Sequence, residues 1–106
     1  MNLAKILTKN GKYLLACSFG PDSMSLFHML FSQGYKFDVA HVNYGLRNEA
    51  KEETENLKKY CDDHNIKIHI LMAKVDGNKN IEDECRKIRY SYFSSLNQIN
   101  HYDAVL

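Results

Sequence analysis

The sequence predicts an α/β domain with three layers, in which one parallel β-sheet lies between helices. Short apolar runs alternate with longer segments whose apolar residues recur every three or four positions, which gives the order βαβαβαβ. The 106 residues suffice for one domain with a modest core, and their hydrophobic content of 44% is typical of a soluble globular protein. Because parallel strands are joined by right-handed crossovers, we expect helices on both faces of the sheet.

The first half of the chain predicts two strands separated by a strongly apolar helix. Residues 3–7 form a short leading helix in this interpretation, and the compact apolar run at residues 13–17 is a strand buried on both faces. The next helix starts at Pro21 and ends at Gly34, where a helix C-cap is expected. Residues 37–43 alternate well enough to be the second strand. The helix residues expected to pack against the sheet are Met24, Phe27, Leu30 and Phe31.

The second half of the chain predicts two further helices and two further strands. A surface helix over residues 49–64, with Asn48 as its cap, precedes a strand over residues 66–72. After a polar loop, Asn80 caps a long helix, and residues 103–106 open a fourth strand. The apolar stripe of the surface helix consists of Ala50, Leu57, Tyr60 and Cys61. The buried face of the long helix consists of Ile81, Cys85, Ile88, Tyr92, Leu96 and Ile99.

The turn between the first strand and the first helix is the strongest candidate for a binding site. Gly20 takes the helix cap position, Pro21 the first helical position, and Asp22 lies in the first turn. Uncapped N–H groups and the positive end of the helix dipole attract anions, and Ser18 and Ser23 add hydroxyl donors. The sequence therefore predicts a phosphate-binding loop, and the alternative is an ordinary strand-to-helix turn with a serine cap.

This loop resembles the Ser-Gly-Gly-x-Asp-Ser loop of the PP-loop ATP pyrophosphatases, which cleave ATP between its α and β phosphates and activate an oxygen as an adenylate. Phe19 departs from that pattern, because the family usually has Gly at this position. An acidic residue inside an anion site indicates a hard cation, so Asp22 is expected to bind Mg²⁺. The resemblance implies a Rossmann-like PP-loop domain that uses ATP. Its implied ATP-binding residues are Ser18, Phe19, Gly20, Pro21, Asp22, Ser23, His41 and Asn43.

A second segment, His-Val-Asn-Tyr-Gly-Leu-Arg at residues 41–47, follows the second expected strand and reaches the same edge of the sheet. It is similar to the His-Val-Asn-His-Gly-Leu-Arg segment of the tRNA(Ile)-lysidine synthetases, the PP-loop branch that modifies an isoleucine tRNA. The resemblance implies that His41 and Asn43 line the nucleotide pocket, and Tyr44, which replaces the second histidine, could stack on a base. Judged without the resemblance, His41 is a structural histidine and Arg47 a solvated loop cation.

A third segment, residues 80–90, resembles the Asn-x-Glu-x-x-Ala-Arg-x-x-Arg-Tyr helix of the same synthetases, with Cys85 in place of the alanine. Arg86 and Arg89 lie three positions apart on one helix face, so their guanidinium groups can converge on one phosphate or carboxylate. The alternative is a surface ion pair between Glu82 and Arg86. With the resemblance, the candidate catalytic residues are Asp22, Arg86 and Arg89.

The three motifs together identify residues 1–106 as the N-terminal part of a PP-loop ATP-binding domain. The resemblance implies that ATP adenylates the wobble cytidine of an isoleucine tRNA with a CAU anticodon, after which the amine of free lysine displaces AMP. Because the family continues with further catalytic residues and tRNA-binding domains, we expect a fragment that binds ATP weakly and does not modify tRNA alone. The alternatives are another PP-loop enzyme, such as a tRNA thiolase or an amidotransferase-type synthetase, and a non-catalytic nucleotide-binding module.

The charge, the cysteines and the hydropathy pattern place further limits on function. A net charge of +1 gives no overall field for nucleic acid, so an RNA-binding surface would be local. The three cysteines, Cys17, Cys61 and Cys85, show no Cys-x-x-Cys spacing and indicate reduced thiols in a cytoplasmic protein. No apolar run reaches membrane-spanning length and the five histidines show no zinc-binding spacing, so neither a membrane nor structural zinc is expected. The resemblance leaves a homodimer open.

Overall fold

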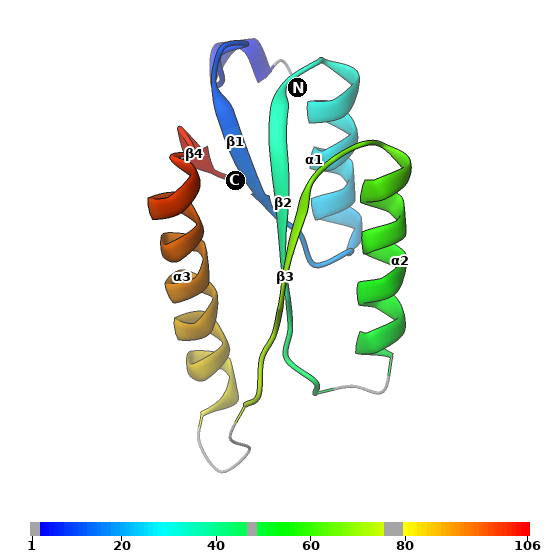
Figure 1. The fold of residues 1–106 in the computed structure, drawn as a ribbon, viewed down its shortest axis with the longest axis vertical. Coiled ribbons are helices and arrows are strands. Elements are labelled where there is room, and N and C mark those ends of the chain that lie inside the picture. Colours follow the sequence, from blue (N-terminus) through cyan, green and yellow to red (C-terminus); the bar gives the residue numbers. More distant parts are fainter. Residues whose placement is uncertain (1–2, 47–48, 76–79) are drawn as a thin grey trace.

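Within residues 3–46, 49–75 and 80–106, which the computed structural model describes, four parallel strands form one sheet with helices on both faces. This arrangement confirms the predicted α/β class. The strand order is β3-β2-β1-β4, with α1 and α2 on one face of the sheet and α3 on the other (Figure 1). In chain order, the elements are a 3₁₀ turn η1 (Leu3–Lys5), β1 (Lys12–Ala16), α1 (Pro21–Ser32), β2 (Lys36–Asn43), α2 (Ala50–Asp63), β3 (Ile68–Met72), α3 (Ile81–Asn100) and β4 (Ala104–Val105).

Alternate residues of each central strand face opposite helical layers, so the sheet divides the core into two parts. Leu15 of β1 lies opposite Val39 of β2 in the register, and both belong to the larger core beside α1 and α2. Leu14 and Ala40, one position away on each strand, belong to the smaller core beside α3. Helix and loop residues of the larger core include Phe27, Leu30, Leu57 and Cys61. Those of the smaller core include Leu96 and Tyr102.

Helix α1 begins where the sequence predicts, and its C-cap is Gln33, one position before the predicted Gly34. Gly20 is its N-cap, Pro21 is its first residue, and Gly34 follows its end with a φ of 79°, a left-handed conformation that glycine adopts without steric cost. One expectation is wrong, because the side chain of Phe31 is 45% exposed rather than buried. It lies at the rim of the helix layer, where its ring meets the ring of His64 edge-on with centroids 4.9 Å apart.

Helix α3 is buried along only part of the face that the sequence predicts. Cys85 and Leu96 are buried as predicted, but Ile81 is 38% exposed and Ile99 is 74% exposed. Neither α3 nor any other helix in the described part of the chain is long and apolar enough to cross a membrane.

The remaining predicted boundaries differ from the observed ones by one or two residues. The leading helix is only the 3₁₀ turn η1, and β3 begins at Ile68 instead of residue 66. Asn65 takes a left-handed φ of 57° after α2, and the N–H of Ile66 still donates to the carbonyl of Cys61 at 2.8 Å. Asn65 and Ile66 therefore belong to the C-terminal turn of α2, although the alternation of apolar residues predicts that a strand begins at residue 66.

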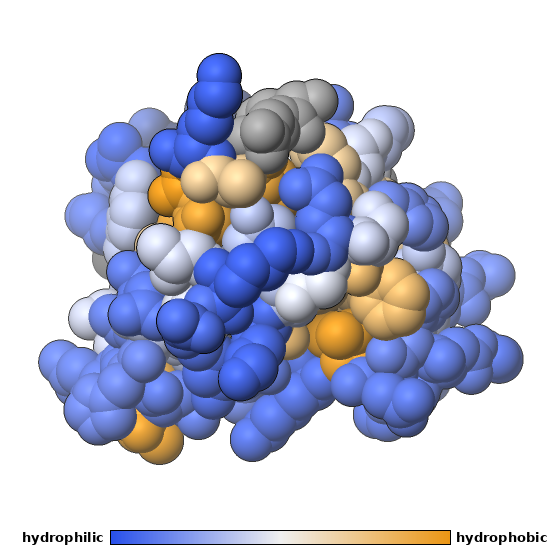
Figure 2. All heavy atoms as spheres, turned by 90° about the horizontal axis from the view of Figure 1, so that it is seen from above, coloured by the Kyte–Doolittle hydropathy of each residue, from blue (hydrophilic) through white to orange (hydrophobic). Residues whose placement is uncertain are grey.

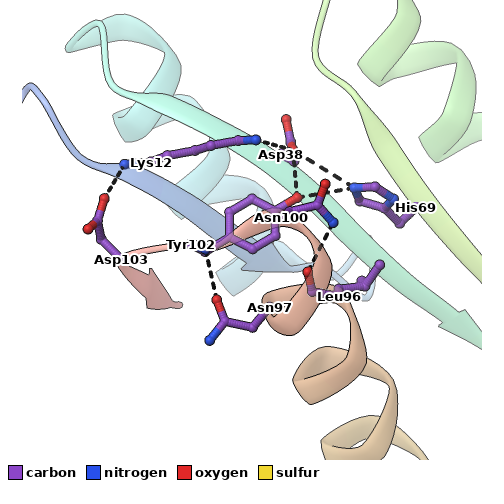
Figure 3. A network of polar contacts seen from close by, with 8 residues as sticks. All are labelled: Lys12, Asp38, His69, Leu96, Asn97, Asn100, Tyr102 and Asp103. Carbon is purple, nitrogen blue, oxygen red and sulfur yellow. Dashed lines mark hydrogen bonds and ion pairs between the residues drawn. The ribbon is translucent and has the colours of Figure 1, made fainter.

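The amino ends of the strands carry a network of polar contacts that holds the C-terminal segment on the sheet (Figure 3). The hydroxyl of Tyr102 donates to Asp38 Oδ2 at 2.6 Å, and His69 Nε2 lies 3.1 Å from the same hydroxyl. Lys12 Nζ lies 3.7 Å from Asp38 Oδ2 and 5.0 Å from the centroid of the Tyr102 ring. The backbone N–H of Lys12 donates to Asp103 Oδ2 at 2.7 Å. Viewed from above, this end of the molecule presents mainly hydrophilic side chains (Figure 2).

Candidate functional site

The carboxyl ends of β1 and β2 bring the predicted motifs to one end of the molecule, in the lower part of Figure 1. The loop at residues 18–20 follows β1, the loop at residues 44–46 follows β2, and the first turns of α3 lie beside them. Parallel α/β sheets bind their ligands at this edge. Three adjoining cavities open there, with volumes of about 620, 320 and 160 Å³.

The N-terminus of α1 lacks a side-chain cap. Gly20 holds the cap position in an extended conformation, and no side chain accepts a hydrogen bond from the first-turn N–H groups there. The alternative of a serine-capped turn is therefore wrong. Ser18 Oγ instead accepts from the Gly20 N–H at 3.4 Å, and the Ser23 hydroxyl donates to the Gly20 carbonyl at 3.1 Å. This geometry leaves the first-turn N–H groups without a side-chain partner, which is compatible with the predicted anion site.

Phe19 keeps a glycine-like backbone inside the loop. Its φ of 64° lies in the left-handed region, and its partly buried side chain packs against the larger core. Ser18 lines the two smaller cavities, whereas Phe19 lines none of the three. The side chain that departs from the resembled loop thus takes part in the packing of the core.

Asp22 and Pro21 lie on the exposed outer side of the loop. Asp22 belongs to no ion pair among the described residues, and its carboxylate is accessible to solvent. Neither residue lines the three cavities. A solvent-facing carboxylate one residue into the helix can hold a divalent cation that also contacts a phosphate chain, because Mg²⁺ typically uses few protein ligands beside phosphate oxygens.

His41 and Asn43 are buried at the carboxyl end of β2, and protein groups satisfy both side chains. His41 Nδ1 lies 2.8 Å from the Cys17 carbonyl, and His41 Nε2 lies 2.9 Å from Thr54 Oγ1. Asn43 Nδ2 donates to the same Thr54 oxygen at 3.1 Å, and Asn43 Oδ1 accepts from the Gly45 N–H at 2.8 Å. The two predicted nucleotide residues therefore form a fixed wall rather than free donors.

That wall belongs to the cavity of about 320 Å³, which is at the small end of the range for ligand pockets. The cavity connects the phosphate loop, the end of β2 and the first turn of α2. Its lining consists of Ser18, His41, Val42, Asn43, Tyr44, Leu46, Ala50 and Glu53. The sequence predicted three of these residues, and the structure brings them together as expected.

Arg86 and Arg89 both line the cavity of about 620 Å³ beside the start of α3, but they contact different groups. Arg86 Nη2 donates to Asp83 Oδ1 at 3.0 Å, so the predicted pair with Glu82 is wrong by one position along the helix. Lys87 contacts the same carboxylate at 3.1 Å. Both cations lower the pKa of Asp83, and the contribution of Lys87 is the larger. Arg89 Nη1 donates to the Tyr44 hydroxyl at 3.2 Å.

Tyr44 is the wall that the three cavities share. Its hydroxyl accepts from Arg89 and donates to the Cys85 carbonyl at 3.4 Å, which links the loop after β2 to α3. Burial raises the pKa of Tyr44, and the hydrogen bond from Arg89 opposes that rise. The phenol of Tyr44 therefore stays neutral at physiological pH, and it separates the cavities while its hydroxyl hydrogen-bonds to α3.

Sequence reasoning missed Thr54, and it expected Tyr44 to stack on a base without predicting the hydrogen bonds of its hydroxyl. A signal for Thr54 exists, because it lies four residues after Ala50 and three before Leu57, on the apolar stripe of α2. A lone hydroxyl on such a stripe indicates a buried polar contact. Arg47 and the predicted cap Asn48 lie outside the described residues, and the cap position of α2 is Glu49.

The fold and the loop define a PP-loop domain, and the family model with that description matches residues 1–106, so the chain belongs to the PP-loop domain family. Several similar proteins are tRNA(Ile)-lysidine synthases. The identity is 39% over 99 residues for Protochlamydia amoebophila (strain UWE25), 35% over 101 residues for Staphylococcus aureus (strain COL) and 33% over 92 residues for Chlamydia pneumoniae. These matches cover 87%, 88% and 84% of this chain but only 21%, 23% and 29% of the relatives. The chain thus spans less than a third of their length.

A solved structure confirms the fold. The chain is similar to a U34-tRNA thiolase from Methanococcus maripaludis, determined with its 4Fe–4S cluster, with a TM-score of 0.73 and 19% sequence identity. The match covers 95% of this chain and 39% of the thiolase chain. At that identity the likeness concerns the arrangement of strands and helices.

Proposed function

We propose that this chain is the ATP-binding part of an enzyme that ligates lysine to the wobble cytidine of an isoleucine tRNA with a CAU anticodon. The observation that carries the proposal is the uncapped N-terminus of α1, which lies beside a cavity walled by Ser18, His41 and Asn43. Similarity to lysidine synthases at 33–39% identity supports the particular reaction. A cytoplasmic location and a homodimer stay predictions.

ATP fits the site as a substrate. The first-turn N–H groups of α1 and the hydroxyl of Ser18 are the donors for its phosphates, and the cavity behind Ser18 is the place for the nucleoside. A Cβ added at Gly20 would lie 3.3 Å from Ser18 Oγ, so a larger residue there would push the Ser18 side chain by a few tenths of an ångström. Asp22 is the residue that would hold Mg²⁺, which supplies positive charge for the departing pyrophosphate.

The cavity beside α3 suits the second substrate, free lysine, or the adenylated intermediate. Its lining combines two guanidinium groups, Arg86 and Arg89, with the carboxylates of Glu82 and Asp83. Guanidinium groups bind a carboxylate or phosphate with paired hydrogen bonds, and carboxylates bind an ammonium group. Because this cavity shares Tyr44 and Leu46 with the nucleotide cavity, both substrates would meet across one wall.

The substitution Asp22→Asn tests the metal-dependent part of the proposal. In isothermal calorimetry with ATP and Mg²⁺, we expect the variant to bind about tenfold more weakly, because the carboxylate no longer holds the cation. Without Mg²⁺ the variant should bind no more weakly than the wild type, because the carboxylate then only repels the phosphates. The matched control is Glu52→Gln, an exposed acid in the first turn of α2. Equal loss of affinity with and without Mg²⁺ would remove Asp22 from the metal site.

A chimera tests the ligation itself. Residues 1–106 replace the matching segment of the lysidine synthase from Staphylococcus aureus, and transfer of radiolabelled lysine to an isoleucine tRNA is measured. We expect the chimera to modify the tRNA and its Asp22→Asn version to fail. A folded chimera that binds ATP but transfers no lysine would overturn the ligation, and a chain that supported sulfur transfer instead would favour the thiolase class.

A further inference from the structure

We propose that Thr54 is a positioning residue of the nucleotide cavity. Its single hydroxyl fixes the imidazole of His41 and the carboxamide of Asn43 in the orientations that shape the wall next to Ser18. The role in ATP binding rests on the proposed function, whereas the hydrogen bonds that carry the inference do not depend on the identity of the ligand.

The hydrogen-bond partners of His41 determine which of its ring nitrogens carries the proton. The Cys17 carbonyl can only accept, so His41 Nδ1 carries the hydrogen in their 2.8 Å contact. In the neutral ring, Nε2 is then an acceptor, and the Thr54 hydroxyl donates to it at 2.9 Å. The Thr54 oxygen keeps its lone pairs for the N–H of Asn43 Nδ2 at 3.1 Å. One hydroxyl thus serves as a donor to one side chain and as an acceptor from the other.

These contacts connect both loops that border the cavity. Cys17 immediately precedes the phosphate loop, and His41 holds its carbonyl. Asn43 turns its oxygen toward Gly45, where φ is 68° and the loop after β2 changes direction. Thr54 lies on α2, so its hydroxyl joins the helix layer to both loops at once. Removing the Thr54 hydroxyl would therefore weaken the contacts that hold both the loop after β1 and the loop after β2.

Burial makes each of these hydrogen bonds difficult to replace. Thr54 and His41 are both 7% exposed, and Asn43 is 5% exposed. A polar group that loses its partner at such a position has little access to water, so the surrounding structure must rearrange. Valine has nearly the shape of threonine but carries a methyl group in place of the hydroxyl, which makes it a direct probe of the hydrogen bonds.

The test compares Thr54→Val with Thr54→Ser in the 106-residue chain. The ¹⁵N resonance of His41 Nε2 and the hydrogen exchange of the Asn43 carboxamide report the contacts, and calorimetry with ATP and Mg²⁺ reports affinity. In Thr54→Val we expect a shifted Nε2 resonance, faster exchange at Asn43 and ATP binding weakened about tenfold. In Thr54→Ser, which keeps the hydroxyl, all three should stay close to the wild type. Asn56→Ala, an exposed change on α2, is the control.

The outcomes separate this inference from the proposed function. Unchanged resonances and exchange in Thr54→Val would overturn the role of the hydroxyl, and changed resonances with unaltered ATP affinity would reduce it to a structural contact. A wild-type chain that binds no ATP would overturn the proposed function and the nucleotide part of this inference, while the resonances still decide what Thr54 holds. If Thr54→Val does not fold, Thr54→Ala takes its place, because it puts no methyl group against the polar atoms.

Discussion

Phe19 combines a left-handed backbone with a ring that packs against the apolar core. A side chain with a Cβ atom usually avoids this backbone region, which costs roughly 1–2 kcal/mol for residues other than glycine. Contact of the ring with the core offsets part of that cost. The loop therefore keeps the path that a glycine would take, while an aromatic ring anchors it from the other side.

A pair of substitutions separates these two contributions. Phe19→Ala removes the ring and keeps the strained backbone, whereas Phe19→Gly removes both. We expect the glycine variant to be more stable than the alanine variant by about 1 kcal/mol in urea unfolding, because glycine adopts a φ of 64° freely. An alanine variant as stable as the glycine variant would show that the loop does not hold a left-handed residue in solution.

Helix α3 shows how the ends of an element position its functional face. Asn80 caps it through a hydrogen bond from the Asp83 N–H to Asn80 Oδ1 at 3.3 Å, and the acids Glu82, Asp83 and Glu84 occupy its first turn near the positive end of the dipole. The same turn bears the carboxylate that orients Arg86. A stable first turn is therefore a condition for the cavity beside it.

We expect Asn80→Ala to lower the free energy of unfolding by about 1 kcal/mol, since the cap hydrogen bond is lost and alanine cannot replace it. Urea denaturation followed by circular dichroism measures the change. Gln98→Ala, an exposed substitution in the last turns of α3, is the control and should leave stability within about 0.5 kcal/mol. Equal effects of the two substitutions would mean that the cap contributes nothing specific.

The molecule as a whole has two different ends. The carboxyl end of the sheet carries the cavities and the uncapped N-terminus of α1. The amino end carries the polar network around Asp38 (Figure 3). In that network, Tyr102 donates to Asp38, and its pKa is raised by burial and by the carboxylate. These contacts fix the segment after α3 on β1 and β2, so they keep β4 in register.

His69 gives this network a pH dependence. Burial lowers its pKa in the folded protein, while Asp38 raises it and Lys67 and Lys12 lower it. Below a pH of about 6.5 the unfolded chain therefore binds more protons than the folded one, and the free energy of unfolding falls as the pH decreases from there. Urea unfolding between pH 7 and pH 5, a range of about two units around that pKa, measures the slope.

The substitution His69→Gln should flatten that slope, because glutamine does not titrate. His28→Gln, at an exposed position on α1, serves as the matched control. A slope unchanged by His69→Gln would assign the pH dependence to other groups. A steeper slope would contradict the inference that burial dominates at His69.

Local patterns were enough for the fold class, for the start of α1 and for the asparagine cap of α3. Each depends on neighbouring residues: the alternation and helical spacing of apolar side chains, a glycine and proline at one helix start, and an asparagine before an acidic turn. The phosphate-binding role of the loop at residues 18–20 stays a prediction of the same local kind, because it depends on a strand followed directly by an uncapped helix start. Placement of His41 and Asn43 at the same edge follows from the parallel order of the strands.

Contacts between distant segments could be decided only by the tertiary structure. Thr54 meets His41 and Asn43, and Tyr44 meets Arg89, through positions that no local spacing relates. Ile99 shares the helical spacing of the buried residues of α3 but is exposed, and helical periodicity does not show which turns of a helix are covered by other elements. Periodicity states which face of an element is apolar, whereas the partner of that face is set by how three layers pack in space. For this reason the sequence could propose a candidate site, and only the fold showed which side chains form the walls of the cavities there.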